Sequence, residues 1–290
     1  MSARSVDFRL SVWLLAAPLL VWLVALIVIP QAELLVVSLQ ERSGSGFHFS
    51  FANYLTFLQE PLYWRTFLRT AIMSILATFL TLILAFPIAF HIAKRVKGRV
   101  QSLLFVACLI PFWVSELVRT YGWMILLRET GLISHALQWL GWADGPVELL
   151  YSDMAVMTGL VYASILFMVV PLVSVLESLD DSLIEAAYDL GASHWQVIKD
   201  IVIPHAMPGI TSGCIMVFML TLGNYLTPRL LGGKDSLWFT EQIYTQFITR
   251  FNWEQGAAFG MLLLMLSTLM VWLGLKSTRQ SFTHVLGKAG

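Results

Sequence analysis

The stretch EAAYDLGASHWQVIKDIVIPHAMPGI, residues 185–210, decides the fold because it is a polar, capped segment between two apolar runs. Just before it, Ser182 stands three residues ahead of Glu185, which is the spacing of a capping box. Gly191 can adopt the left-handed conformation in which many helices end. The spacing therefore predicts a short helix that starts near Ser182 and ends at Gly191.

The predicted helix has an acidic face and an apolar face. Asp181, Glu185 and Asp189 follow one another at intervals of four residues and share one face. The apolar face combines two alanines, which leave room for a close-packed partner, with two leucines: Leu183, Ala186, Ala187 and Leu190. A helix that only lies on an anionic lipid surface is typically rich in Lys and Arg. The acidic composition therefore favours a groove on a protein partner.

A second short helix is predicted directly after the first. Ser193 and Gln196 repeat the capping-box spacing at its start. Proline disfavours the helical conformation in the residue before it, so we expect this helix to end at Pro204. Pro208 and Gly209 are then expected to turn the chain into the next apolar run.

The rest of the chain has the composition of a membrane protein. Of 290 residues, 58% are apolar and 12% are charged, and the mean hydropathy is +0.75. A helix needs about 20 apolar residues to cross the hydrocarbon. Six runs meet this requirement: about 11–37, 67–93, 101–127, 154–177, 208–231 and 256–276. We expect an all-α membrane protein with one transmembrane domain, residues 1–290, whose solvent is the lipid bilayer.

Basic residues predict the orientation of the chain. The cluster KRVKGR at 94–99 lies in one short loop, and Lys and Arg in short loops mark the cytoplasmic side. This topology places both termini and the segment 178–207 in the cytoplasm. The formal net charge is zero, so the chain has no basic surface for a nucleic-acid partner.

Charged residues inside the third run are candidates for a transport pathway. Glu116 and Arg119 are three residues apart, and charge within the membrane is costly unless it faces a partner or a water-filled cavity. The two side chains could pair with each other and hold the helix. Alternatively, Glu116 could face a cavity near the aromatic residues Trp113 and Tyr121.

A second candidate lies in the fifth run. Asn224 and Tyr225 are predicted to be in mid-span. An asparagine there forms either an interhelical hydrogen bond or part of a pathway. Aromatic side chains such as Tyr225 could hold a cationic solute through cation–π contact.

The capped segment resembles the EAA loop of permease subunits of ABC importers. The resemblance rests on EAA at 185–187, on Gly191 six residues after Glu185, and on Ile-Pro at 203–204. It implies the type I importer fold, with six transmembrane helices and a coupling-helix loop between the fourth and fifth. In the family this loop docks on the ATP-binding subunit. The residues expected to couple to the ATPase are Glu185, Ala186, Ala187, Asp189, Gly191 and Pro204.

Over most of its length the chain resembles spermidine/putrescine-type permeases. The matching segments are EPLYW at 60–64, PFWVSELVRTYGW at 111–123, FMVVPLVSVLESLD at 167–180 and LTPRLLGG at 226–233. The resemblance implies a bacterial inner membrane, a periplasmic substrate-binding protein, an ATPase dimer and a second permease subunit that is a sister chain. It also implies that this chain binds no cofactor, because ATP and Mg are used by the partner ATPase.

Two departures leave the solute open. Polyamine permeases often have an acidic residue where this chain has Asn224, and Arg229 adds a positive charge near the end of the same run. An opine, an amino acid or another small amine is therefore an alternative to a polyamine within the same class of importer.

Three other classes of protein fit the sequence less well than an importer subunit. An ion-coupled secondary transporter would show inverted repeats, and no repeat is evident. An enzyme would need a phosphate loop, a metal site or a nucleophile beside a base. The string LGGKDS at 231–236 lacks the spacing of a phosphate loop, and the six histidines form no i, i+4 pair. A purely structural subunit would not need the intramembrane charges of Glu116 and Arg119.

Overall fold

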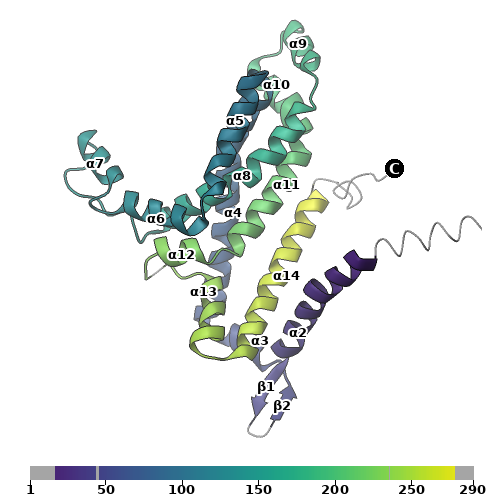
Figure 1. Cartoon of the computed structure of the whole chain (residues 1–290), viewed down its shortest axis with the longest axis vertical. Coiled ribbons are helices and arrows are strands. Elements are labelled where there is room, and N and C mark those ends of the chain that lie inside the picture. The colour runs from purple at the N-terminus through teal and green to yellow at the C-terminus, as the bar shows by residue number, and fades with distance from the viewer. Residues whose placement is uncertain (1–16, 44–45, 235, 278–290) are drawn as a thin grey trace, which may run out of the picture. The chain divides into compact units, whose positions relative to one another are not determined.

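The computed structural model describes residues 17–43, 46–234 and 236–277, and most of them are helical (Figure 1). The chain forms two compact units. The first unit comprises Met1–Trp64 and Gln242–Met265, and the second comprises Arg65–Glu241 and Leu266–Gly290. Each unit is described by itself below.

The first unit contains short elements and a hairpin. Its elements are η1 (Val24–Val28), α2 (Ile29–Ser38), β1 (Gln40–Ser43), β2 (Gly46–Phe49), α3 (Ala52–Gln59) and η5 (Thr245–Thr249), with the start of α4 (Pro61–Phe90) and most of α14 (Trp253–Ser277). The two strands pair antiparallel. Tyr63 anchors the unit: its ring lies 4.8 Å from that of Phe259, and its hydroxyl accepts a hydrogen bond from Arg250 Nη1 at 3.1 Å.

The second unit contains the long helices. Its elements are the rest of α4, η2 (His91–Arg95), α5 (Arg99–Leu109), η3 (Ile110–Trp113), α6 (Glu116–Leu127), α7 (Leu132–Trp139), α8 (Asp153–Glu177), α9 (Asp181–Asp189), α10 (His194–Val197), η4 (Ile198–Val202), α11 (Ile203–Leu222), α12 (Leu226–Leu231), the first half of α13 (Phe239–Tyr244) and the end of α14. In Figure 1, α8 and α11 run side by side.

Glycine allows α8 and α11 to approach closely. A Cβ atom on Gly209 would lie 2.8 Å from the carbonyl oxygen of Pro171, and one on Gly213 would lie 2.6 Å from Met168 Sδ. Small residues at helix contacts are the usual means by which membrane helices pack without a hydrophobic driving force. The α8–α11 pair is therefore the centre of the second unit.

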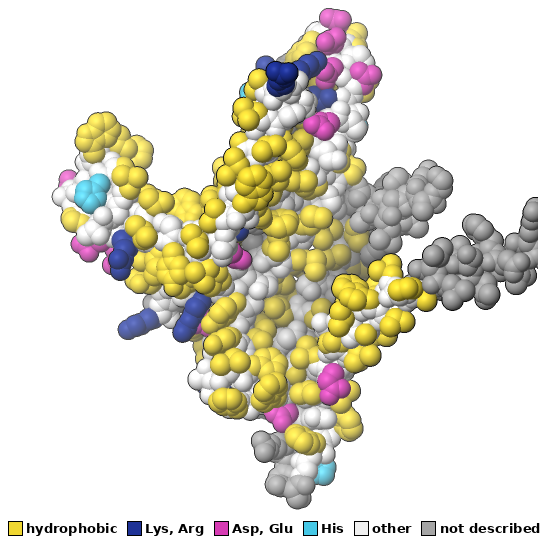
Figure 2. Space-filling view, viewed as in Figure 1, with side chains coloured by type: hydrophobic (Ala, Val, Ile, Leu, Met, Phe, Trp, Pro, Cys, Tyr) yellow, Lys and Arg dark blue, Asp and Glu magenta, His cyan; other side chains and the backbone are white. Residues whose placement is uncertain are grey.

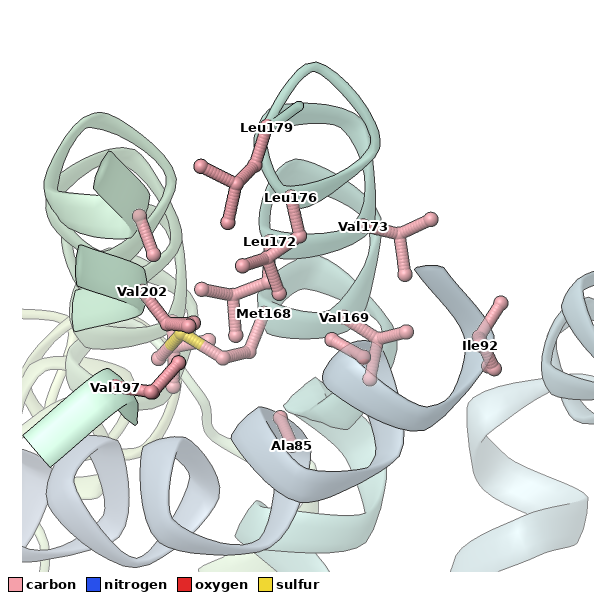
Figure 3. Packing of buried hydrophobic residues seen from close by; sticks show 13 residues of the cluster. Ala85, Ile92, Met168, Val169, Leu172, Val173, Leu176, Leu179, Val197 and Val202 are labelled. Atoms are coloured by element: carbon pink, nitrogen blue, oxygen red, sulfur yellow. The ribbon is translucent and has the colours of Figure 1, made fainter. Parts of the chain in front are cut away.

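The main apolar cluster extends from this helix pair to α9. Figure 3 shows its buried residues, among them Ala85 of α4, Ile92 of η2, and Met168 and Leu172 of α8. Val197 of α10 and Val202 of η4 belong to the same cluster, as does Leu179, just before α9. These residues continue the cluster beyond the helix pair. The short helices therefore share one core with the long ones.

Among the described residues, five helices are long and apolar enough to cross a membrane, and a bent pair makes a sixth if it counts as one span. The five are Ala17–Ser38, Pro61–Arg95, Asp153–Glu177, His194–Leu222 and Trp253–Lys276. The prediction of an all-helical membrane protein with about six spans is thus confirmed. Of the first predicted span, residues 11–16 lie outside the described residues.

The third predicted span, 101–127, is not one straight helix. Helical segments Arg99–Trp113 and Glu116–Trp139 meet at an angle of 91°. Pro111 has no N–H to continue the helical hydrogen bonds, and Val114 is extended, with φ −89° and ψ 134°. The break places Glu116 at the start of a helix instead of in mid-span.

The fifth predicted span, 208–231, has different ends in the structure. The helix begins at His194 and continues through Pro204 and Pro208 to Leu222. The prediction that Pro204 ends a helix is therefore wrong. The π-helical turn η4 precedes this proline, and the local change in hydrogen bonding at such a turn can accommodate a residue that lacks an N–H.

Candidate functional site

A cavity lies in the second unit, among α6, α8 and the break between α11 and α12. Its volume is about 460 Å³. It is lined by Phe112, Glu116, Arg119, Leu160, Ala163, Ser164, Phe167, Leu220, Thr221, Gly223, Asn224, Tyr225 and Leu226. The helix break after Trp113 and the break after Leu222 both open onto this space, so two interruptions of the predicted spans build one site.

Asn224 and Glu116 meet in this cavity. Asn224 Nδ2 donates a hydrogen bond of 2.8 Å to Glu116 Oε1. Asn224 Oδ1 accepts from the N–H of Thr227 at 2.9 Å, so the amide also caps the first turn of α12. The predicted fifth span is interrupted at Asn224, because Gly223, Asn224 and Tyr225 separate α11 from α12. The interhelical hydrogen bond and the cavity position, which were weighed as alternatives, occur together.

Arg119 does not pair with Glu116. None of the ion pairs among residues 17–43, 46–234 and 236–277 joins them. The guanidinium carbon instead lies 4.7 Å from the centre of the Phe112 ring and 6.0 Å from that of Tyr162. Its Nε and Nη1 are buried and donate no hydrogen bond within the described part of the chain. Stacking on aromatic rings can stabilise such a cation.

The cavity unites only some of the predicted pathway residues. Glu116, Arg119, Asn224 and Tyr225 line it. Trp113 and Tyr121 do not, and the Trp113 side chain is 79% exposed. Sequence reasoning missed the other lining positions, including Phe112, Ser164 and Thr221. Only Phe112 had a visible signal, as an aromatic residue four positions before Glu116.

Arg229, just beyond the cavity, is paired. Its Nη1 donates to Glu241 Oε1, and the two side chains form an ion pair. The pair neutralises the positive charge that argued against a cationic solute. Within the described ranges, no three His, Cys, Asp or Glu side chains come together as metal ligands.

The second candidate site is α9, at one end of the second unit. Its N-cap is Asp180, whose carboxylate accepts the N–H of Ser182 at 3.0 Å. The predicted cap at Ser182 is therefore wrong: the helix starts earlier, because the side chain of Asp180 forms the cap. The hydrogen bond from the Ser182 backbone lowers the pKa of Asp180.

The end of α9 agrees with the prediction. Gly191 has φ +81°, in the left-handed region. The N–H of Gly191 donates to the Tyr188 carbonyl at 2.9 Å, and that of Ala192 donates to the Ala187 carbonyl at 3.0 Å. This is the Schellman pattern. Ser193 and Gln196 then form the predicted capping box.

The two faces of α9 differ in what they contact. Ile184 and Ala187 pack against the main apolar cluster. Glu185, Ala186 and Leu190 are exposed, and Leu190 is 89% exposed. Of the two alanines of α9, only Ala186 is exposed; Ala187 belongs to the core side. Figure 2 shows acidic side chains gathered at this end of the molecule, with Lys and Arg beside them.

Comparison with known proteins agrees with this geometry. The family described as "Binding-protein-dependent transport system inner membrane component" matches residues 77–276. The spermidine/putrescine transport system permease protein PotB of Salmonella typhimurium (strain SL1344) is 36% identical over 261 residues, which are 89% of this chain and 90% of that protein. PotB of Haemophilus influenzae is 33% identical over 254 residues, covering 87% of this chain and 88% of that protein.

The fold also matches solved structures. A chain of the bacterial alginate ABC transporter, crystallised with an alginate-pentasaccharide-bound periplasmic protein, superposes with a TM-score of 0.78. The match covers 95% of this chain and 96% of that chain, with 18% sequence identity. It shows that this chain has the fold of an ABC importer transmembrane subunit.

Proposed function

Because the chain belongs to the family of binding-protein-dependent transport system inner membrane components, and is a transmembrane subunit of an ABC importer, we propose that it carries a polyamine such as putrescine or spermidine. The hydrogen-bonded Glu116 carboxylate in the cavity is the observation that carries this proposal. The names of the relatives, which are 33–36% identical over most of the chain, support the same class of solute.

The cavity has the chemistry to hold an ammonium group. A carboxylate forms strong, charge-assisted hydrogen bonds with an alkylammonium, and Asn224 orients Glu116 toward the lined space. Arg119 would repel a cation, but its guanidinium lies against Phe112. Tyr225 adds an aromatic wall. The side chain of Glu116 would thus bind one amine of the solute at a time.

Exposed groups of α9 would contact the ATPase. We assign the contact to Glu185, Ala186 and Asp189, which are exposed. Gly191 ends the helix, and Ala187 packs it against the core. Pro204 lies in α11, the helix that would return into the membrane. ATP and Mg would bind to the partner, whose closure would move α9 and rock the long helices between outward-open and inward-open states.

The assembly and orientation follow from the same proposal. The chain is a multi-pass inner-membrane protein; both termini would lie in the cytoplasm, as the basic loop at 94–99 indicates. Its two compact units would form one permease domain. A sister permease chain would complete the pathway, and the periplasmic binding protein would deliver the solute.

A second solute class has one observation in its favour. The cavity holds one carboxylate and one guanidinium, Glu116 and Arg119, so it is formally neutral. A small amine that also carries a carboxylate, such as an opine or an amino acid, would suit that balance.

Uptake measurements separate the two classes. Cells that lack this gene and cells that carry it on a plasmid would be given labelled putrescine, spermidine, a panel of amino acids and an opine. The proposal expects loss of polyamine uptake alone in the deletion and its return with the plasmid. Unchanged polyamine uptake with loss of another solute would contradict the polyamine assignment and leave the importer class intact.

A further inference from the structure

We propose that Lys94 is a positioning residue that transmits the movement of α9 to the second long helix, and so to the solute cavity. The inference rests on the proposed coupling role of α9. It goes beyond that role because it names the contact through which α9 acts on one particular membrane helix. Lys94 lies in η2, at the end of the helical segment Pro61–Arg95.

The side chain of Lys94 is buried and bonds to the start of α9. Its Nζ donates to the Leu179 carbonyl and, at 2.9 Å, to Asp181 Oδ1. Only 7% of the Lys94 side chain is exposed. Lysine is almost never buried to this extent unless its charge is paired. The single ammonium therefore holds both Leu179, two residues before α9, and Asp181, which begins the helix.

Asp181 receives a second lysine on its other oxygen. Lys97 Nζ donates to Asp181 Oδ2 at 3.1 Å, but its side chain is 81% exposed. Exposed ion pairs contribute little because water and salt screen them. Lys94 is therefore the stronger of the two links, and Lys97 serves as an internal comparison.

Apolar packing also holds α9 against the helical segment that carries Lys94. Ile184 and Ala187 of α9 pack against the apolar cluster that contains Ala89 and Ile92, on the same helical segment as Lys94. A displacement of Glu185, one turn after Asp181, would therefore displace this segment as well. Apolar contacts are not directional and would let α9 shift along this segment. The hydrogen bonds of Lys94 fix the position of α9 on it.

The same helix reaches the wall of the cavity. Thr81 Oγ1 of α4 lies 3.5 Å from Ser164 Oγ of α8. Ser164 lines the cavity that contains Glu116 and Asn224. The contacts thus run from Asp181 through Lys94 and along α4 to Ser164, all within the second unit. Coupling between distant sites needs such an element that both sites can bias.

The test uses the complete importer, reconstituted with its ATPase, sister permease and binding protein. The variants are Lys94→Met, which keeps the aliphatic stem, Lys94→Arg, Lys97→Met, and the matched control Arg95→Met, whose exposed side chain lies beside Lys94. Solute uptake and ATP hydrolysis are measured in the same vesicles. Co-purification of the ATPase shows that each variant assembles.

We expect Lys94→Met to lower uptake per ATP about tenfold, within the usual range of coupling between sites, while hydrolysis stays within about twofold. Lys94→Arg should restore most of the coupling, Lys97→Met should show a small loss, and Arg95→Met should behave as the parent. A proportional fall of uptake and hydrolysis, or no change in either, would overturn the inference. Glu185→Arg in the same assay separates the two proposals: if it uncouples and Lys94→Met does not, only the role of Lys94 is wrong.

Discussion

The side-chain amide of Asn224 donates a 2.8 Å hydrogen bond to the carboxylate of Glu116, 108 positions earlier in the chain. The bond joins two breaks in the helices, and the backbone at each break lies outside regular helix. Such irregular backbone is tolerated in a membrane where it lines a cavity. The pair thus marks the place where an apolar protein keeps a polar, hydrogen-bonded site.

Removing the charge of Glu116 should impair transport of a cationic solute. Glu116→Gln keeps the size of the side chain and can still accept from Asn224, but it loses the attraction to an ammonium group. We expect uptake at saturating ATP to fall about tenfold or more, because a hydrogen bond to a charged group is worth roughly 1.5–3 kcal/mol. The measurement is the initial rate of labelled putrescine uptake.

Glu129→Gln provides the matched control for this change, because Glu129 is exposed and lies outside the cavity lining. It should leave the uptake rate unchanged. Equal rates in the Glu116 variant and the parent would remove this carboxylate from the pathway.

The left-handed glycine after α9 should tolerate no side chain without strain. Gly191 has φ +81° and open space around the position of a Cβ atom, so only the backbone conformation opposes Gly191→Ala. The cost should be about 1–2 kcal/mol. Amide hydrogen exchange at Gly191 and Ala192, whose N–H groups close the helix end, should accelerate.

Gly145→Ala is the comparison for the backbone effect. Gly145 also has open space around its Cβ position but no positive φ. Its substitution should leave exchange at 191–192 unchanged. Equal exchange in the Gly191 variant and the parent would show that the left-handed turn does not hold the end of α9.

Close packing of α8 on α11 predicts opposite effects for two glycine substitutions. In Gly209→Ala the new methyl would lie 2.8 Å from the Pro171 carbonyl oxygen, which cannot move alone. Overpacking of this kind costs about 1–3 kcal/mol, so the purified complex should unfold at lower temperature. Gly122→Ala, in α6 with open space, should be neutral or stabilise by up to about 1 kcal/mol. The reverse order of melting temperatures would contradict the helix contact.

The stabilisation of α9 by the ion pair between Lys94 and Asp181 should not change with pH near neutrality. Hydrogen bonds from Lys94, and then from Lys97, lower the pKa of Asp181. A lowered pKa means that the contribution to stability is present above the unfolded-state pKa of about 4 and is lost as the pH falls through the lower, folded value. Hydrogen-exchange protection of the α9 amides, corrected for intrinsic rates, should stay constant from pH 8 to 5 and decline only below pH 4. A decline between pH 7 and 5 would show that another group controls the link.

Local signals in the sequence predicted local structure well. Gly191 and the Ser193–Gln196 box act within a few residues, so their spacing was sufficient. The start of α9 was missed because Asp180 and Ser182 are both good cap residues, and spacing alone does not rank neighbouring acceptors.

Long-range structure could not be predicted in the same way. The hydropathy of the third and fifth runs indicates no interruption, because residues 110–115 are mostly apolar and the three residues 223–225 are too few to lower the average of the fifth run. The hydrogen bond between Glu116 and Asn224 joins residues at the two breaks, and a contact between residues so far apart in the chain leaves no mark on hydropathy. The π-helical turn before Pro204 likewise has no simple pattern in the sequence.

The most direct test of the account is the ratio of solute uptake to ATP hydrolysis in the reconstituted importer carrying Glu185→Arg, with Asp200→Arg as an exposed acidic control in the same loop. Coupling through α9 predicts that Glu185→Arg abolishes ATP-driven uptake while membrane insertion is intact and the control transports normally. Uptake at the parental rate in the Glu185 variant would contradict the coupling role of α9.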